Sequence, residues 1–232
     1  LWLPGILGTG KTPSQVLRNR SIRGLLLPPQ PAPNTRLDLD WDDFSAVSFG
    51  FTLTAPSLHN VGIDHFRSIQ NLLREIHRLG YRRPLLLLSL KSDQRVSFAW
   101  SAGFHVGCRQ LGLPPSEPVH LTSSDFRDFL AAVRKAKPDV VLTTRGWATL
   151  AREQLPAAGL RVPEDVALAA VNYAATDQGQ GGIFEDGLLV GRHAVDILTA
   201  MVQRGEVGIP KNVKHLITEG TFHPGFSLGR IS

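Results

Sequence analysis

The stretch AGLRVPEDVAL, residues 158–168, holds the signals for the end of one helix and the start of one buried strand. Gly159 can adopt the left-handed conformation that commonly follows the last turn of a helix. Pro163 cannot continue a helix, because it lacks the backbone N–H and has a fixed φ. An uninterrupted apolar run then starts at Val166. We therefore predict a helix that ends at Gly159 and a buried strand over residues 166–171.

The same alternation of a short apolar run and an amphipathic segment repeats along the chain. Repeated strand–helix units of this kind are typical of α/β proteins with parallel sheets. Further strands are predicted at residues 24–27, 46–49, 85–88, 139–142 and 215–217. Helices are predicted to begin after Asp64 and Asp125, and to cover residues 98–111, 147–157 and 187–202.

The composition is that of a soluble protein with enough apolar side chains for one globular unit or two small lobes. Of 232 residues, 42% are hydrophobic and 19% are charged. The net charge is +5, but the basic residues are scattered, as at solvated helix ends. One cysteine, Cys108, excludes an internal disulfide. No apolar run approaches the roughly 20 residues of a membrane span, and no signal peptide is visible, so we expect a cytoplasmic protein.

Residues 5–12 match G-x-x-x-x-G-K-[ST], the phosphate-binding loop of nucleotide hydrolases. Such a loop needs a buried strand before it and an acidic residue at the end of another strand to hold Mg²⁺. Pro4 interrupts the preceding run, and the strands at 85–88 and 139–142 are followed by Ser89 and Thr143. We therefore interpret residues 5–12 as a glycine-rich surface loop. A P-loop hydrolase is the enzyme alternative, and nucleotide turnover lost on Lys11→Ala would favour it.

Three more stretches accompany residues 158–168. They are LGYRRPLLLL at 79–88, VGRHAVDIL at 190–198 and FHPGFS at 222–227. Their order and spacing resemble the effector-binding domain of LacI-type bacterial transcription regulators, over residues 20–227. The resemblance implies a type I periplasmic-binding-protein fold, with two doubly wound parallel-sheet lobes. It also implies a ligand in the cleft between the lobes, at the carboxyl ends of strands.

The resemblance also implies how the chain is divided. The N-terminal lobe would comprise residues 1–90 and 184–212, and the C-terminal lobe residues 91–183 and 213–232. The first strand and helix of the N-terminal lobe are expected to be missing, because Leu1 enters at the second strand. The family's N-terminal helix-turn-helix, which binds palindromic operators as a dimer, matches none of these residues.

The predicted function is therefore the ligand-sensing and dimerising domain of a LacI-type repressor. A small-molecule effector, a sugar or a related compound, would shift the lobes and change how the missing helix-turn-helix binds operator DNA. An extracytoplasmic sugar- or solute-binding protein is the alternative. No G-x-S-x-G motif and no zinc framework is present, so no catalytic residue, cofactor or metal is predicted.

Six residues are candidate ligand contacts, because they stand where the family carries sugar-binding side chains. Asp64 opens the helix before LGYRR, and an N-cap is the equal alternative for this carboxylate. Trp100 stands where an Arg is usual, three residues before Gly103, and would either stack on a ligand or fill the cleft. The other candidates are Thr144, Arg145, Asn172 and Glu185.

These four differ in how well they match the family. Thr144 and Arg145 replace an Asn-Asp pair, so the charge is reversed and suits an anionic ligand or an internal ion pair. Asn172 replaces an Asp and can still bind a hydroxyl group. Glu185 matches a polar residue that is common before the long helix. His59 and His65 flank a strand-to-helix turn and are expected to be exposed to solvent.

Overall fold

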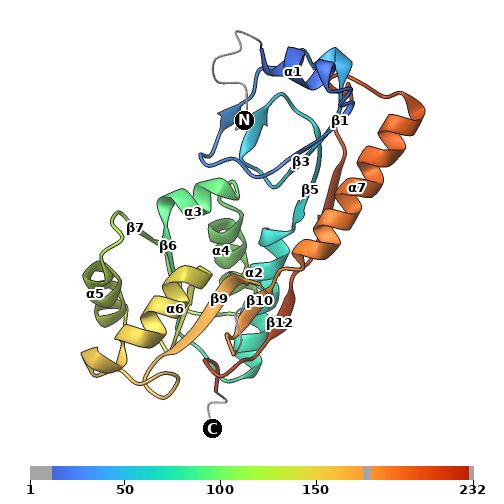
Figure 1. Ribbon diagram of the computed structural model, residues 1–232. Coiled ribbons are helices and arrows are strands. Elements are labelled where there is room, and N and C mark those ends of the chain that lie inside the picture. The colour runs from blue at the N-terminus through green and yellow to red at the C-terminus, as the bar shows by residue number, and fades with distance from the viewer. Residues whose placement is uncertain (1–11, 175–178, 230–232) are drawn as a thin grey trace. The chain divides into compact units, whose positions relative to one another are not determined.

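The computed structural model describes residues 12–174 and 179–229, whose alternating strands and helices can be followed in Figure 1. The chain forms two compact units. The first unit comprises the described residues up to Ile63 together with Gly187–Thr218. The second unit comprises Asp64–Asp186 and the described residues from Glu219 onward. The α/β class with parallel sheets is confirmed.

The first unit is built on a parallel sheet. Its order within the described residues is β1 (Gly24–Leu27), β3 (Ser45–Phe49), β5 (His59–Ile63) and β11 (His215–Thr218). The long helix α7 (Gly187–Arg204) covers one face, where Ala194 and Met201 pack on Val47 and Val61. Leu39 and Trp41 cover the other face, against Leu27 and Ala46.

Short elements complete the first unit. Helix α1 (Pro13–Asn19) precedes β1, and the 3₁₀ turn η1 (Trp41–Asp43) precedes β3. Strands β2 (Thr35–Arg36) and β4 (Leu53–Ala55) pair with each other in parallel. Thr12 caps α1, because its hydroxyl accepts a hydrogen bond from the backbone N–H of Gln15 at 3.3 Å.

The second unit has a larger sheet with the order β12-β10-β9-β8-β6-β7. The strands are β6 (Pro84–Ser89), β7 (Val119–Leu121), β8 (Val140–Thr143), β9 (Ala167–Tyr173), β10 (Gly182–Phe184) and β12 (Thr221–His223). All neighbours pair in parallel except β10 and β12, which are antiparallel. The helices are α2 (His65–Arg78), α3 (Leu90–Arg95), α4 (Ala99–Gln110), α5 (Phe126–Ala136), α6 (Arg145–Gln154) and the turn η2 (Pro156–Ala158).

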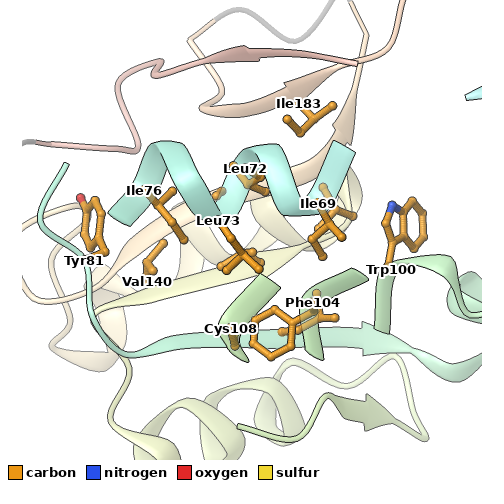
Figure 2. Close-up of a cluster of buried hydrophobic side chains, with 14 of the residues drawn as sticks. Ile69, Leu72, Leu73, Ile76, Tyr81, Trp100, Phe104, Cys108, Val140 and Ile183 are labelled. Carbon is orange, nitrogen blue, oxygen red and sulfur yellow. The ribbon is translucent and has the colours of Figure 1, made fainter. Parts of the chain in front are cut away.

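Both faces of this sheet are buried, as the nearly continuous apolar strands predict. Leu86 and Leu88 point to the face covered by α2 and α4, whereas Leu85 and Leu87 point to the face covered by α5 and α6. In Figure 2, Ile69 and Leu73 of α2 face α4, which contributes Phe104 and Cys108. The two helices approach closely at Gly103, where an added Cβ atom would lie 2.5 Å from Ile69 Cγ2.

The compact units differ from the expected lobes in three ranges, of which the shortest, residues 184–186, belongs to the second unit. Residues 64–90 belong to the second unit, because α2 packs on α4 and β6 pairs with β7 and β8. Residues 213–218 belong to the first unit, because β11 pairs with β5. The predicted helix ends earlier than expected, because α6 stops at Gln154, and Gly159, with φ of 81°, caps the 3₁₀ turn η2 that follows. Among the described residues, no helix is both long and apolar enough to span a membrane.

Candidate functional site

All six candidate residues lie at one edge of the second unit's sheet, where the parallel strands end. Thr144 and Arg145 follow β8, Asn172 is near the end of β9, and Glu185 follows β10. Trp100 is in the first turn of α4, which follows β6 on the way to β7. Asp64 caps the N-terminus of α2, and α2 runs antiparallel to β6, so its N-terminus is at the same edge.

This edge contains the point where the chain connections diverge. Strands β6 and β8 are neighbours, but β6 leads to α4 on one face and β8 leads to α6 on the other. In open α/β sheets, ligands bind in the crevice that such diverging connections leave at the carboxyl ends of the strands.

A pocket of about 740 Å³ lies at this point, within the size range of small-molecule sites. It is formed by the segments that follow β6, β7 and β8. Its apolar lining comes from Leu90, Leu121, Trp147 and Leu150. Its polar lining comes from Ser89, Lys91, Ser92, Gln94, Thr122, Ser123, Ser124 and Thr144, and Gly146 completes the wall. Thr144 is the one predicted residue that lines this pocket.

A second group at the same edge surrounds His65. Its Nδ1 lies 3.1 Å from a carboxylate oxygen of Glu185, and its ring packs edge-on against Trp100 with centroids 5.1 Å apart. The His65 side chain is only 10% exposed, so the expectation that His65 is exposed is wrong. His59 is buried as well, and its Nδ1 accepts a hydrogen bond from the backbone N–H of Lys214. The structure thus brings Trp100 and Glu185 together through a residue that was not among the candidates.

Asp64 has the capping role. Its Oδ1 accepts a hydrogen bond from the backbone N–H of Arg67 at 2.9 Å, and its other oxygen lies 3.6 Å from the Arg67 guanidinium. Such a contact supplies a partner for one of the free N–H groups of the first helical turn. A ligand contact by the same carboxylate stays a prediction.

Arg145 and Asn172 also meet. The Asn172 side-chain oxygen accepts a long hydrogen bond, 3.4 Å, from the backbone N–H of Arg145. This contact joins the ends of β8 and β9, which are neighbouring strands. The amide therefore stabilises the start of α6, and its NH₂ group is the part that can donate to a ligand.

Buried polar atoms without partners gather at this edge. Among the described residues they include Oδ1 of Asp93, Nε1 of Trp100 and Oγ1 of Thr143. Asp93 and Thr143 are fully buried, and Trp100 is 4% exposed. A buried polar group without a hydrogen bond costs about 1–3 kcal/mol, so a group of them calls for an explanation. Their common location at the carboxyl ends of the strands fits a ligand-binding edge.

Asp93 links two walls of the pocket. It belongs to α3, and its Oδ2 accepts hydrogen bonds from the Ser101 hydroxyl and, at 2.9 Å, from Nε2 of His120 on β7. Residues on either side of Asp93 and the residues just after His120 line the pocket. This buried carboxylate therefore holds α3 against β7.

Two other interpretations concern nucleotides and metals. Of the residues 5–12 that match the phosphate-loop pattern, only Thr12 is within the described part of the chain, where it caps α1. Gly5, Gly10 and Lys11 lie outside the described residues. Within the described ranges, no group of three or more His, Cys, Asp or Glu residues is placed to hold a metal ion.

A family model for the periplasmic binding protein-like domain matches residues 73–221, which is more than half of the chain. The chain belongs to this family. The match includes every strand of the second unit that surrounds the pocket. No curated protein sequence matches the chain.

Solved structures share the fold at low sequence identity. A transcription regulator-like protein from Staphylococcus haemolyticus has a TM-score of 0.67 and 18% identity, over 94% of this chain and 79% of that one. A periplasmic binding protein/LacI transcriptional regulator from Alkaliphilus metalliredigens, solved with D-xylulofuranose, has a TM-score of 0.69 and 15% identity, over 94% and 81%. The lac repressor dimer, solved with operator and the anti-inducer ONPF, has a TM-score of 0.69 and 15% identity, over 93% and 77%.

These comparisons confirm the predicted type I periplasmic-binding-protein-like fold. The matched structures include transcription regulators of the LacI type, so the resemblance seen in residues 79–88, 158–168 and 190–198 is matched by a shared fold over 93–94% of the chain.

Proposed function

We propose that this chain is the effector-sensing domain of a LacI-type transcription regulator and that its ligand binds at the carboxyl-end edge of the second unit's sheet. The observation that carries the proposal is the coincidence of three features at one edge. These are the pocket after β6, β7 and β8, the divergence of β6 and β8, and the buried polar atoms without partners.

The regulatory part of the proposal comes from the resemblance. The related lac repressor was solved as a dimer bound to operator, and the Alkaliphilus metalliredigens protein with a sugar. By analogy, this domain is cytoplasmic, forms a homodimer and represses transcription through a helix-turn-helix segment outside residues 12–229. Effector binding then changes the conformation that the DNA-binding segments require.

A thermal-shift screen tests the binding part. The 232-residue chain is heated with sugars, sugar phosphates and nucleosides, each at a concentration well above its dissociation constant. A ligand at about 100 times its Kd stabilises the folded protein by roughly 2.7 kcal/mol. A hit supports the proposal, and a flat response across all three classes contradicts it.

A gel-shift experiment tests the regulatory part. The 232-residue chain should bind operator DNA poorly, whereas the full-length regulator should bind it tightly. Adding the effector should weaken or strengthen the binding of the full-length regulator to the operator. Tight, sequence-specific binding by the 232 residues alone would contradict this assignment.

An extracytoplasmic solute-binding protein is the second candidate, because the family model and one matched structure carry that description too. The coding sequence upstream of Leu1 separates the two. A helix-turn-helix favours the regulator, and a signal peptide favours the solute-binding protein.

A further inference from the structure

The lining of the pocket after β6, β7 and β8 carries a positive charge and no negative charge. Lys91 is the single ionisable side chain in its lining, and no carboxylate lines it. Lys91 is exposed, and within the described part of the chain it forms no ion pair. A cation without a partner at the wall of a pocket favours a negatively charged ligand.

The N-terminus of α6 opens onto the same pocket. Thr144 is the N-cap residue, but its side chain makes no capping hydrogen bond. The backbone N–H groups of Gly146 and Trp147 have no hydrogen-bond partner among the described residues. A Cβ atom at Gly146 would meet nothing within 4 Å, so a ligand can approach this backbone. Helix N-termini with free N–H groups bind phosphate and other anions.

A buried hydroxyl group supports this location independently. Thr143 directly precedes the N-cap and is fully buried, and its Oγ1 has no partner within residues 12–174 and 179–229. By strand alternation its side chain points to the same face as Val141, which packs in the cluster beneath α6. Thr143 does not itself line the pocket, but it directly precedes Thr144, which does.

The nearby carboxylates are already engaged. Asp125 pairs with Arg127 at 2.5 Å, and Asp128 accepts a hydrogen bond from Ser123. Asp93 is fully buried and accepts hydrogen bonds from Ser101 and His120. These interactions reduce the repulsion that the acidic groups around the pocket would exert on an anion.

The remaining lining suits a small ring with hydroxyl groups. Trp147 lines the pocket, and its ring stacks on the ring of Phe129 with centroids 5.4 Å apart. Aromatic side chains of this kind provide an apolar surface for a ring. Thr122 and Ser124 also line the pocket, and no described residue engages their hydroxyl groups.

We propose that the effector is a sugar phosphate, bound with its phosphate group at Lys91 and the N-terminus of α6 and its ring against Trp147. This inference rests on the proposed function and specifies the ligand class. Because the inference depends on the negative charge of the ligand, the appropriate comparison is between the affinities of one sugar with and without its phosphate group.

The test measures binding by isothermal titration calorimetry. The probes are ribose 5-phosphate, glucose 6-phosphate, ribose, glucose and inorganic phosphate. At least one phosphorylated sugar should bind roughly tenfold more tightly than its neutral parent, as expected for a charge-assisted contact. Its affinity should fall as salt is raised from about 0.05 M to about 0.5 M, because ions screen the charge.

Three variants locate the contact. Lys91→Gln should abolish the preference for the phosphorylated sugar, and Lys91→Arg should keep it because the charge remains. Lys135→Gln removes an exposed lysine of α5 and should leave the preference unchanged. Melting temperatures near the wild-type value would show that each variant is folded.

The outcomes separate this inference from the proposed function. Neutral sugars that bind as tightly as their phosphates would overturn the inference and support the proposed function. A phosphate preference that survives in Lys91→Gln would overturn the assigned position. No binding by any of these five probes would overturn the inference, whereas only a flat thermal-shift response across sugars, sugar phosphates and nucleosides would contradict the proposed function.

Discussion

Nδ1 of His65 and a carboxylate oxygen of Glu185 lie 3.1 Å apart, with side chains that are 10% and 21% exposed. The contact joins the N-terminus of α2 to the segment after β10, beside Trp100. Two segments that are distant in the sequence are thereby fixed at the carboxyl-end edge of one sheet.

Replacing Glu185 should therefore destabilise the second unit. Glu185→Ala removes the carboxylate that lies 3.1 Å from His65 Nδ1, a close contact without hydrogen-bond geometry, and its loss should cost about 1 kcal/mol. The matched control is Glu153→Ala, which removes an exposed glutamate of α6 and should change stability by less than about 0.5 kcal/mol. Urea unfolding measures both. Equal stabilities of the two variants would show that the His65–Glu185 contact contributes nothing.

The close approach of α2 and α4 makes Gly103 sensitive to any side chain. A Cβ atom there would lie 2.5 Å from Ile69 Cγ2 and 2.5 Å from the backbone oxygen of Phe66, which cannot move freely. Gly103→Ala should cost about 1–3 kcal/mol of unfolding free energy. At Gly191, in α7, a Cβ atom meets nothing within 4 Å, so Gly191→Ala should stabilise by about 0.5–1 kcal/mol. A lower melting temperature for Gly103→Ala and a higher one for Gly191→Ala would confirm the close α2–α4 packing. Changes of the same sign in both variants would contradict it.

His59 should make the first unit less stable in mild acid. Burial, followed by the charge of Lys214, lowers the pKa of His59 below its ordinary value of about 6.5. The unfolded chain then takes up a proton that the folded protein excludes, so stability is lost as the pH falls below about 6.5. The decrease in melting temperature from pH 7.5 to pH 5 should be smaller in His59→Asn. Identical decreases in both proteins would contradict this role.

Cys108 should be unreactive until the protein unfolds. Burial raises the pKa of this thiol to about 11, and the residue is 4% exposed. Because the thiolate is the reactive form, modification by a disulfide reagent at pH 8 should be at least roughly 100-fold slower in native protein than in urea. Cys108 is the single cysteine, so the reaction reports on one site. Equal rates would mean that the α2–α4 core opens readily.

Much of the fold follows from local sequence patterns. The strand at 85–88 and the helix after Asp64 are visible because apolar residues recur at fixed spacing and Gly80 ends the helix. The assignment of residues 64–90 to a lobe is not local. It depends on the pairing of β6 with β8 and the packing of α2 on α4, which bring together segments far apart in the chain.

The candidate site, too, has residues that the sequence could identify and residues whose role depends on contacts with other segments. Thr144, Asn172 and Glu185 were proposed because the family carries ligand-binding side chains at these positions, and the structure places them at or near the carboxyl ends of β8, β9 and β10. His65 and Lys91 were missed, because their importance comes from neighbours in other segments. His65 matters because Glu185 and Trp100 surround it, and Lys91 because no carboxylate lines the same pocket. The very short strands β7, β10 and β12 also had no clear periodic signal.

Hydrogen–deuterium exchange with the best ligand of the screen tests the central claim most directly, namely that the ligand binds at the carboxyl-end edge of the second unit's sheet. The account predicts slower exchange in residues 89–94, 121–124 and 144–150, which line the pocket. Slower exchange confined to the amino ends of the same strands, at residues 82–85 and 138–140, would contradict it.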